Sequence, residues 1–342
     1  MRKVLRYLIR ITLICLLLFF YVNYNGIQYT LGLLTNSIRD PYFDSSGYEP
    51  ARNCFGEEEC SSGELRVLCY NILCRICEPE QPWEERLPYL RRLIAYYDPD
   101  LFGSQELGGW KDIEELLADT EEYETVTFTF GPWTYADSAL FFKKERFELL
   151  DSGQFWLNPK HNLPFGFGWL RLSMPRYACW ACLRDKSNGF TFLFMNSHFD
   201  NNSLNKDTTA PIMYDNFAKH GERLPIVFTG DFNTDLRAER YEKLLSGTEG
   251  VKVFTNAADL APALEMQLYT AGERNTERES FTAYDQAIEH ILVAGPGEVS
   301  VGEWIMDYNS YGDPQQDASD HPALFATLRF DLRKTETHDD ED

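Results

Sequence analysis

A strand pattern that ends in polar side chains constrains this chain most strongly. Residues 226–230 form a largely apolar run, and Asp231 and Asn233 follow it directly. A short run of this kind is typical of a strand that is covered on both faces. Because successive side chains of a strand alternate, Asp231 and Asn233 point the same way. The run therefore predicts an interior strand that delivers a carboxylate and an amide to the edge of a sheet.

A second polar motif stands before the last apolar run. Ser319, Asp320 and His321 precede residues 323–330, so a carboxylate lies beside an imidazole at the start of a predicted strand. Each motif alone could be an ordinary turn, because Gly, Asp, Asn and Ser dominate turns. Their joint occurrence at strand edges indicates a polar site instead.

Two further strand patterns also end in polar side chains. Residues 65–70 lead to Asn71, and a turn followed by residues 101–105 leads to Glu106. Four strands would thus bring amide, carboxylate and imidazole groups to one end of the fold. Mg²⁺ prefers oxygen ligands and needs only one or two carboxylates besides water and substrate phosphate. The four motifs together predict a metal-dependent phosphoesterase.

The order of these motifs resembles that of the endonuclease/exonuclease/phosphatase superfamily, the group of deoxyribonuclease I. The resemblance covers residues 65–330 and includes a strand that ends in His198, with Ser197 and Phe199 where the family has Thr and Leu. Arg176 matches a strand start whose Arg contacts substrate phosphate in the family. The resemblance implies a four-layer α/β/β/α sandwich with its site at one end of the sheets.

The resemblance also implies a carboxylate that holds each active-site histidine. By position these are Asp137 for His198 and Glu289 for His321. Asp137 is one methylene shorter than the usual Glu, and Glu289 is one methylene longer than the usual Asp. We expect both carboxylates to remain within hydrogen-bond reach.

The resemblance further implies a divalent metal ion, Mg²⁺ or Mn²⁺. Glu106 would be its principal ligand, with Asn71 and Asp320 completing the protein's share of the coordination shell. Asn71 would also contact the substrate phosphate. The residues are compatible with these roles, which are assigned from the family.

The remaining roles belong to an in-line attack of water on a phosphorus ester. Asp231, positioned by Asn233, would orient or deprotonate the water. His321 and His198 would stabilise the charge that develops on phosphate oxygens, and one of them would protonate the leaving group. Arg176 would clamp a non-bridging oxygen.

Each residue also has a purely structural interpretation. Asn71 could simply end a strand, Glu106 could be a solvated loop carboxylate, and His198 could be a satisfied interior histidine. Arg176 could be a surface cation. The joint order at several strand ends favours the site over these separate explanations, and a catalytically silent binding module of the same fold is the rival hypothesis.

Charge and one aromatic loop bear on the substrate. The chain has 32 Lys and Arg against 54 Asp and Glu, a net charge of −22, which works against non-specific nucleic-acid binding. A lipid or small phosphoester is therefore favoured over nucleic acid, and a nuclease with a local basic groove is the alternative. Residues 162–170 are rich in aromatic side chains and glycine. They could stack on bases, enter a lipid headgroup layer or pack on the sheet edge.

The N-terminal residues 1–35 have the order of an export signal. Four cations, the last of them Arg10, precede the apolar residues 11–22. No clean cleavage site follows, so an uncleaved membrane anchor is favoured, with the catalytic domain on the non-cytoplasmic side. Cleavage would instead give a secreted or periplasmic protein.

The rest of the chain divides by composition. Residues 36–64 lose apolar periodicity and are predicted to be a linker, within which Cys54 and Cys60 could form a disulfide. Residues 65–332 would form the catalytic domain, and residues 333–342 an acidic tail.

Two Cys-x-x-Cys pairs have the spacing of zinc ligands. Cys179 and Cys182 fall within a strand pattern and would point to opposite faces. We therefore interpret the cysteines, including Cys74 and Cys77, as small apolar residues rather than as a zinc site.

Local periodicity predicts the regular elements. A helix is expected over residues 83–97, ended by Asp98-Pro99, with shorter helices over 110–117 and 241–245. Strands are expected over residues 65–70, 101–105, 124–130, 138–142, 147–157, 176–184, 190–197, 225–230, 289–293 and 322–330.

Overall fold

The structure is a computed structural model that describes residues 3–18, 54, 62–75, 77, 81–120, 122–127, 137–157, 176–201, 203–221, 223–270, 273–275, 284–311 and 316–332. The predictions for the aromatic loop 162–170 and the tail 333–342 lie outside these residues. The first strand begins at Ser62, inside the segment that the sequence assigns to the linker.

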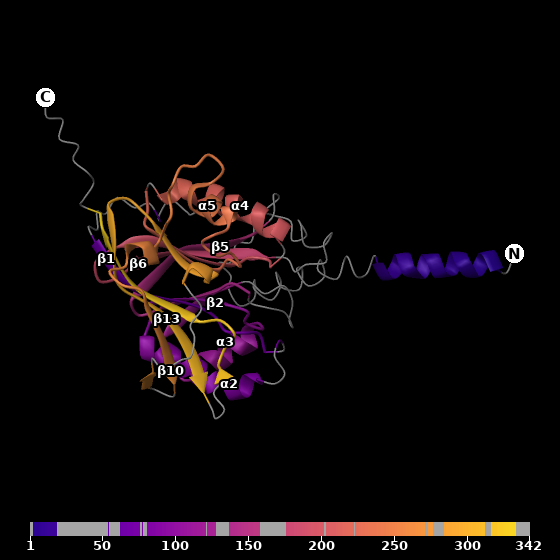
Figure 1. Ribbon diagram of the computed structural model, residues 1–342, viewed down its shortest axis with the longest axis horizontal. Coiled ribbons are helices and arrows are strands. Elements are labelled where there is room, and N and C mark those ends of the chain that lie inside the picture. Colours follow the sequence, from indigo (N-terminus) through magenta and orange to yellow (C-terminus); the bar gives the residue numbers. More distant parts are fainter. Residues whose placement is uncertain are drawn as a thin grey trace.

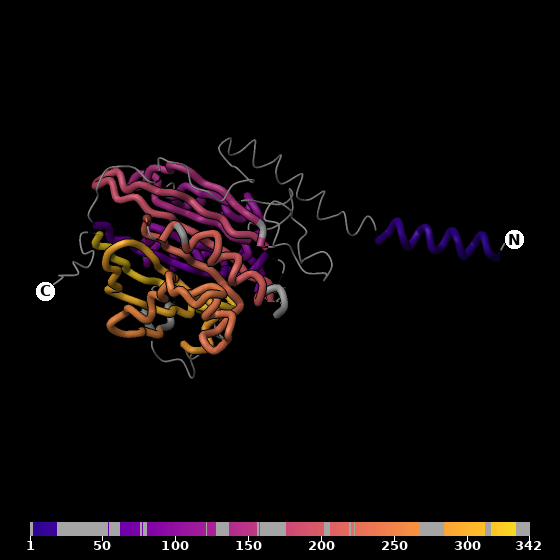
Figure 2. The backbone as a smooth tube through the Cα atoms, turned by 90° about the horizontal axis from the view of Figure 1, so that it is seen from above, coloured from indigo at the N-terminus to yellow at the C-terminus, as the bar shows by residue number. Residues whose placement is uncertain are grey.

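Two mixed sheets form the centre of the molecule (Figure 1). Within the described residues, the larger sheet has nine strands in the order β11 (Glu273–Asn275), β10 (Glu265–Thr270), β13 (Glu298–Tyr311), β15 (Ala323–Asp331), β1 (Ser62–Asn71), β2 (Leu101–Gln105), β4 (Ala139–Lys143) and β3 (Tyr123–Val126), with β14 (Gln316–Asp317) paired to β13. In the same part of the chain the smaller sheet has six, in the order β5 (Phe147–Trp156), β6 (Tyr177–Asp185), β7 (Thr191–His198), β8 (Ile226–Asp231), β12 (Glu289–Ala294) and β9 (Thr255–Asn256). Figure 2 shows β5, β6 and β7 (magenta to pink) side by side along one side of the molecule.

Helices cover the outer faces of both sheets. Figure 1 shows α2 (Trp83–Tyr97) and α3 (Trp110–Leu116) on one side of the molecule and α4 (Ser203–Gly221) and α5 (Glu239–Ser246) on the other. One apolar cluster lies between the sheets, and two more lie under the two helix layers. This order confirms the predicted α/β/β/α sandwich. The short helices α6 and η3 span Ala257–Leu260 and Tyr284–Gln286.

The continuous apolar pattern of β1 follows from its place between two layers. Leu65 and Val67 pack into the cluster between the sheets, while Leu68 and Tyr70 pack under α2 and α3. All four side chains are fully buried. A strand covered on both faces needs apolar side chains in both alternating positions, which hides the two-residue period in the sequence.

Strand pairing determines which polar residues lie side by side at the ends of the strands. In the larger sheet β1 and β2 run parallel, with Asn71 opposite Gln105. In the smaller sheet β7 and β8 run parallel, with His198 opposite Asp231, and the antiparallel strand β12 places Glu289 opposite Asp231. The carboxyl ends of parallel strands meet at one edge, so the predicted polar residues lie together there.

Residues 3–18 form a helix, drawn in indigo in Figure 1, and every one of them is exposed. In the described part of the chain, no helix has both the length and the apolar character required to cross a membrane. The end of the predicted apolar segment, residues 19–22, lies outside the described residues.

The cysteines differ from the sequence-based prediction at two places. Cys74 and Cys77 form a disulfide. Cys54, which was expected to pair with Cys60, is a buried free thiol, and Cys60 lies outside the described residues. Cys179 and Cys182 are buried in β6, as the strand pattern indicates, and neither belongs to a disulfide within the described residues.

Candidate active site

Asn71 connects the two halves of the site. Its side-chain amide donates to Glu106 Oε1 and to Asp231 Oδ2, at 3.1 Å in both cases. Its amide oxygen accepts from the backbone N–H of Leu73 at 3.1 Å. Asn71 therefore joins the predicted metal ligand of the larger sheet to the predicted base of the smaller sheet.

Two site residues adopt a left-handed backbone. Glu106, just after β2, has φ 66°, and Asn233, two residues after β8, has φ 47°. Asn tolerates this conformation, whereas for Glu it is strained and persists only where the surroundings fix it. The surroundings of Glu106 include the backbone N–H of Cys74, which donates to Oε2 at 3.0 Å. The strain at Glu106 thus marks a position whose side-chain direction is tightly set.

Asp231 is the buried centre of the site, with 1% of its side chain exposed. Its Oδ1 accepts from Asn233 N at 2.8 Å, and its Oδ2 lies 3.4 Å from His198 Nε2 and 3.8 Å from His321 Nδ1. Burial pushes its pKa up, but the two histidines and the hydrogen bonds from Asn233 and Asn71 outweigh burial and hold the pKa below its usual value. Asp231 is therefore ionised at neutral pH.

Each histidine has its own carboxylate. His198 Nδ1 lies 2.9 Å from Asp137 Oδ1, and His321 Nδ1 is hydrogen-bonded to Glu289 Oε1. Burial lowers the pKa of His321, but the hydrogen bond and charge of Glu289, together with Asp231, raise it to about 10. The structure thus brings together both predicted pairs despite their changed lengths, and His321 is a cation at neutral pH.

Arg176 lies beside the Asp137 and His198 pair. Its Nη1 is 2.5 Å from Asp137 Oδ2 and 2.8 Å from His198 Nδ1. Its Nε is buried and finds no hydrogen-bond partner among the described residues. The guanidinium therefore sits at the histidine end of the site with donor capacity left, and its contact with a substrate phosphate stays a prediction.

In the Ser319 motif, Ser319 makes buried hydrogen bonds, whereas Asp320 faces solvent. Ser319 Oγ donates to Asn71 O at 2.6 Å and accepts from His321 N at 3.2 Å, so it fixes the histidine relative to the end of β1. Asp320 points outward, with 61% of its side chain exposed and Oδ1 3.7 Å from His321 Nε2. Its role as a metal ligand stays a prediction.

The donor atoms fit a hard divalent cation. The half-buried Glu106 carboxylate is a ligand of the kind that Mg²⁺ and Mn²⁺ prefer. Asn71 faces Glu106 with its amide nitrogen while its amide oxygen accepts from Leu73 N, so its role as a metal ligand stays a prediction. Asp231, Glu289 and His321 also place potential ligand atoms within 4.8 Å of one another. In that group Glu289 and His321 already bind each other, so it suits proton transfer better than metal binding.

The sequence-based predictions missed Arg86, which holds the loops around the site. Arg86 is fully buried in α2 and donates to the carbonyl oxygens of Ile72 at 2.7 Å, Leu73 at 2.9 Å and Ala318 at 2.8 Å. These carbonyls flank Asn71 on one side and the Ser319 motif on the other. The sequence does contain a signal for Arg86: it is a cation that falls on the apolar face of the helix, four residues before Leu90.

A buried polar network below the site was also missed. Asn196 of β7 donates to Ser104 O at 2.8 Å and to Ala139 O at 2.9 Å, and its Oδ1 accepts from Gln105 Nε2 at 2.6 Å. These bonds tie the two sheets together directly beneath the strand ends. At Gly103 a Cβ atom would lie 2.0 Å from Thr229 Oγ1, so only glycine permits this approach.

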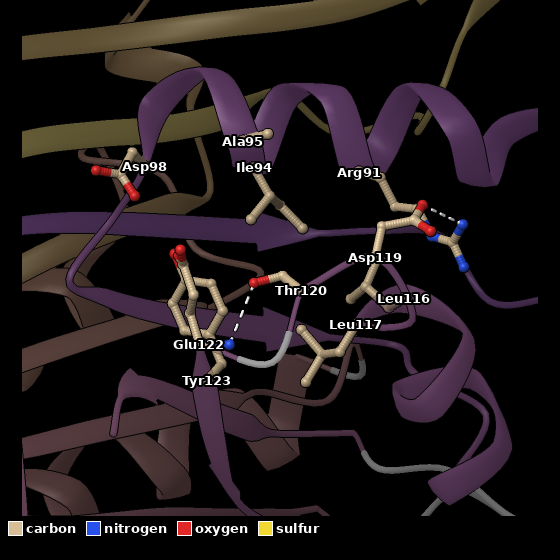
Figure 3. Close-up of a pocket in the computed structure, with 10 residues that line it drawn as sticks. All are labelled: Arg91, Ile94, Ala95, Asp98, Leu116, Leu117, Asp119, Thr120, Glu122 and Tyr123. Atoms are coloured by element: carbon tan, nitrogen blue, oxygen red, sulfur yellow. Dashed lines mark hydrogen bonds and ion pairs between the residues drawn. The ribbon is translucent and has the colours of Figure 1, made fainter. Parts of the chain in front are cut away.

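A surface pocket elsewhere shares no residue with the site. Figure 3 shows it between α2, the end of α3 and the start of β3, with apolar side chains such as Ile94 and Leu117 on its walls. Within its lining, Arg91 pairs with Asp119 at 2.6 Å, and Glu122 N donates to Thr120 Oγ1 at 3.2 Å. Because none of the clustered strand-end carboxylates and histidines lines it, this pocket is no rival for the candidate active site.

Comparison with known proteins supports the fold. Neither a protein-family model nor a curated protein sequence matches the chain. Among solved structures, an endonuclease/exonuclease/phosphatase family protein from Bacteroides thetaiotaomicron is 23% identical, with a TM-score of 0.66 over 82% of this chain and 100% of that one. A mannosyl-6-phosphatase from the same organism is 23% identical, with a TM-score of 0.62 over 77% and 99%.

A more distant structure is TDP2 from D. rerio in complex with a single-strand DNA product. It is 16% identical, with a TM-score of 0.58 over 78% of this chain and 98% of that one. The chain therefore has the fold of the endonuclease/exonuclease/phosphatase proteins, which confirms the resemblance seen in the sequence.

Proposed function

We propose that the protein is a divalent-metal-dependent hydrolase of phosphoester bonds. One observation carries the proposal: an ionised, buried Asp231 lies between two histidines that each have a carboxylate partner, and Asn71 connects it to Glu106. The hydrolases among the structures of this fold support it. A structural role alone does not account for this concentration of charge at strand ends.

In this mechanism Asp231 acts on the attacking water. Its low pKa keeps it ionised, so it can accept a hydrogen bond or the proton itself. Asn233 N holds the other carboxylate oxygen, which fixes the direction of Oδ2. Mg²⁺ or Mn²⁺, held by Glu106 and Asn71 with Asp320 as a further ligand, would polarise the phosphoryl group.

The two histidines act on the phosphate oxygens. In His321, Nδ1 is occupied by Glu289, which leaves Nε2 to donate to a phosphate oxygen or to the leaving group. In His198, Nδ1 is taken by Asp137, and Nε2 faces Asp231 and lies 3.3 Å from Asn233 Nδ2. His321 is therefore the better proton donor, and Arg176 adds positive charge near His198.

The substrate class follows from charge. A chain of net charge −22 gains little from non-specific attraction to nucleic acid, so a lipid-borne or small phosphoester is favoured. The mannosyl-6-phosphatase among the similar structures fits this preference. A nuclease is the second candidate, which the TDP2 complex with DNA supports.

A substrate panel tests the proposal. We expect the full chain to hydrolyse at least one sugar phosphate, inositol phosphate or phospholipid, with activity lost in chelator and restored by Mg²⁺ or Mn²⁺. Plasmid DNA at low salt should be a poor substrate. Efficient DNA degradation without turnover of the small and lipid substrates would overturn the substrate preference. Absence of both turnover and Mg²⁺ binding would favour a catalytically silent binding module.

We further propose that residues 1–35 anchor the protein in a membrane, with the catalytic domain on the non-cytoplasmic side. The exposed apolar side chains between Val4 and Leu18, and the cations at positions 2, 3, 6 and 10, support this. We expect the protein to stay in the membrane fraction after a high-salt wash, because salt screens peripheral attachment but not a spanning helix. A mature N-terminus between Asn25 and Ser37 would show a cleaved signal instead.

A further inference from the structure

The Cys74–Cys77 loop lies directly beside Glu106. The Cα atoms of the two cysteines are 5.2 Å apart, and Cys77 N donates to Cys74 O at 3.2 Å. Cys74 N donates to Glu106 Oε2 at 3.0 Å, and Cys77 Sγ lies 4.0 Å from the same oxygen. Both sulfurs and a Glu106 oxygen lie within 4.8 Å of one another.

The neighbouring cations pair with other groups. Arg75, between the two cysteines, is bound to Asp112 at 2.8 Å and to Glu84 at 2.6 Å, so its charge is committed to those carboxylates. Arg86 donates to Cys74 O at 3.4 Å, which holds the loop from the other side. Cys74 is therefore held at its backbone carbonyl, and both sulfurs lie near the Glu106 carboxylate.

We propose that reduction of the Cys74–Cys77 disulfide creates a binding site for a soft divalent cation, Zn²⁺ above all, from the two thiolates and Glu106. Thiolate ligands select zinc over the hard cations that oxygen ligands prefer. Three protein ligands leave a fourth tetrahedral position for water. Ligand atoms around one zinc are roughly 3.3–3.8 Å apart at the usual bond lengths, so small side-chain movements complete the site.

The chemistry balances with a dithiol as the reductant. The dithiol transfers two electrons and two protons, the S–S bond of the protein breaks, both cysteines become thiols, and the reductant leaves as a disulfide. Metal binding then displaces one proton from each thiol. The site differs from the four-cysteine arrangement considered from the sequence, because Cys179 and Cys182 are buried in β6.

Formation of the binding site does not depend on catalysis. Its expected effect on hydrolysis rests on the proposed function. Glu106 would be shared between the soft cation and the hydrolytic metal. A Zn²⁺ ion held by the thiolates would draw the Glu106 carboxylate toward the loop. Zn²⁺ would then inhibit the reduced protein and spare the oxidised one.

Cobalt spectroscopy tests the binding site without reference to activity. The full chain is reduced with a dithiol, separated from it under anaerobic conditions and titrated with Co²⁺. We expect a sulfur-to-cobalt charge-transfer band and the visible bands of tetrahedral Co²⁺, which Zn²⁺ bleaches and excess Mg²⁺ does not. The oxidised chain should show neither band. Equal bands in the oxidised and reduced chains would overturn the proposal.

Variants locate the ligands. Cys77→Ser, at an exposed position, and Cys74→Ser should each lose the charge-transfer band, and Glu106→Gln should keep it but raise the Kd for Co²⁺ by at least ~10-fold. Cys182→Ser is the matched control and should bind like the native chain. Loss of the band in Cys182→Ser but not in Cys77→Ser would refute the assignment. A chain that binds Co²⁺ but hydrolyses nothing would refute the proposed function alone.

Discussion

Asp231→Asn is expected to lower turnover by roughly 10²- to 10⁴-fold, the range for loss of a positioned acid or base. The amide has nearly the same shape as the carboxylate, but it is neutral and cannot accept a proton from water. It would also lie beside His198 and His321 without the negative charge that the carboxylate places next to them. Turnover of the best substrate from the panel, measured at saturating Mg²⁺, checks this.

The matched control is Asp235→Asn, the same chemical change four residues along the chain. Asp235 pairs with Arg237 at 2.6 Å and stands outside the cluster of strand-end residues. We expect its turnover to stay within about twofold of native, as for surface substitutions. Native turnover in both Asp231→Asn and His321→Ala would refute the catalytic assignment.

Arg86→Met is expected to destabilise the fold by about 3–5 kcal/mol, because several buried carbonyl oxygens lose a charged donor at once. Methionine fills much of the same volume, so the loss reports hydrogen bonding rather than a large cavity. Turnover should also fall by roughly 10²-fold, since the loops that carry Asn71 and His321 would no longer be held together. Urea unfolding and turnover at a temperature where both proteins are folded measure the two effects.

Arg92→Met is the control, since Arg92 lies in the same helix and is exposed. Its stability should change by no more than about 0.5 kcal/mol. Equal stability of the Arg86 and Arg92 variants would contradict the role given to Arg86.

Elements whose side chains show a complete local pattern were predicted from the sequence. The helix over residues 83–97 has its predicted bounds, because its apolar spacing is regular and Asp98 takes a left-handed backbone conformation that ends it. The strand over residues 101–105 also has its predicted bounds.

Elements whose local pattern is mixed were missed. The helix Ser203–Gly221 was not predicted, since it contains Pro211 and many polar residues. The long strand Glu298–Tyr311 was not predicted either, because a register shift between Val301 and Trp304 interrupts its alternation. The helix is stabilised by packing on the smaller sheet and the strand by pairing with β10 and β15, rather than by their own periodicity.

The sequence by itself determined which polar side chains stand at strand ends, because strand periodicity and apolar runs are local properties of the chain. Only the tertiary structure decided which of these side chains meet. Asn71 and Asp231 are 160 positions apart, and Ser319 and Asn71 are 248 positions apart. Their contacts depend on strand order, register and the distance between two sheets. Those quantities are set by the packing of the whole core, as are the burial that fixes Arg86 and the approach of Cys77 to Glu106.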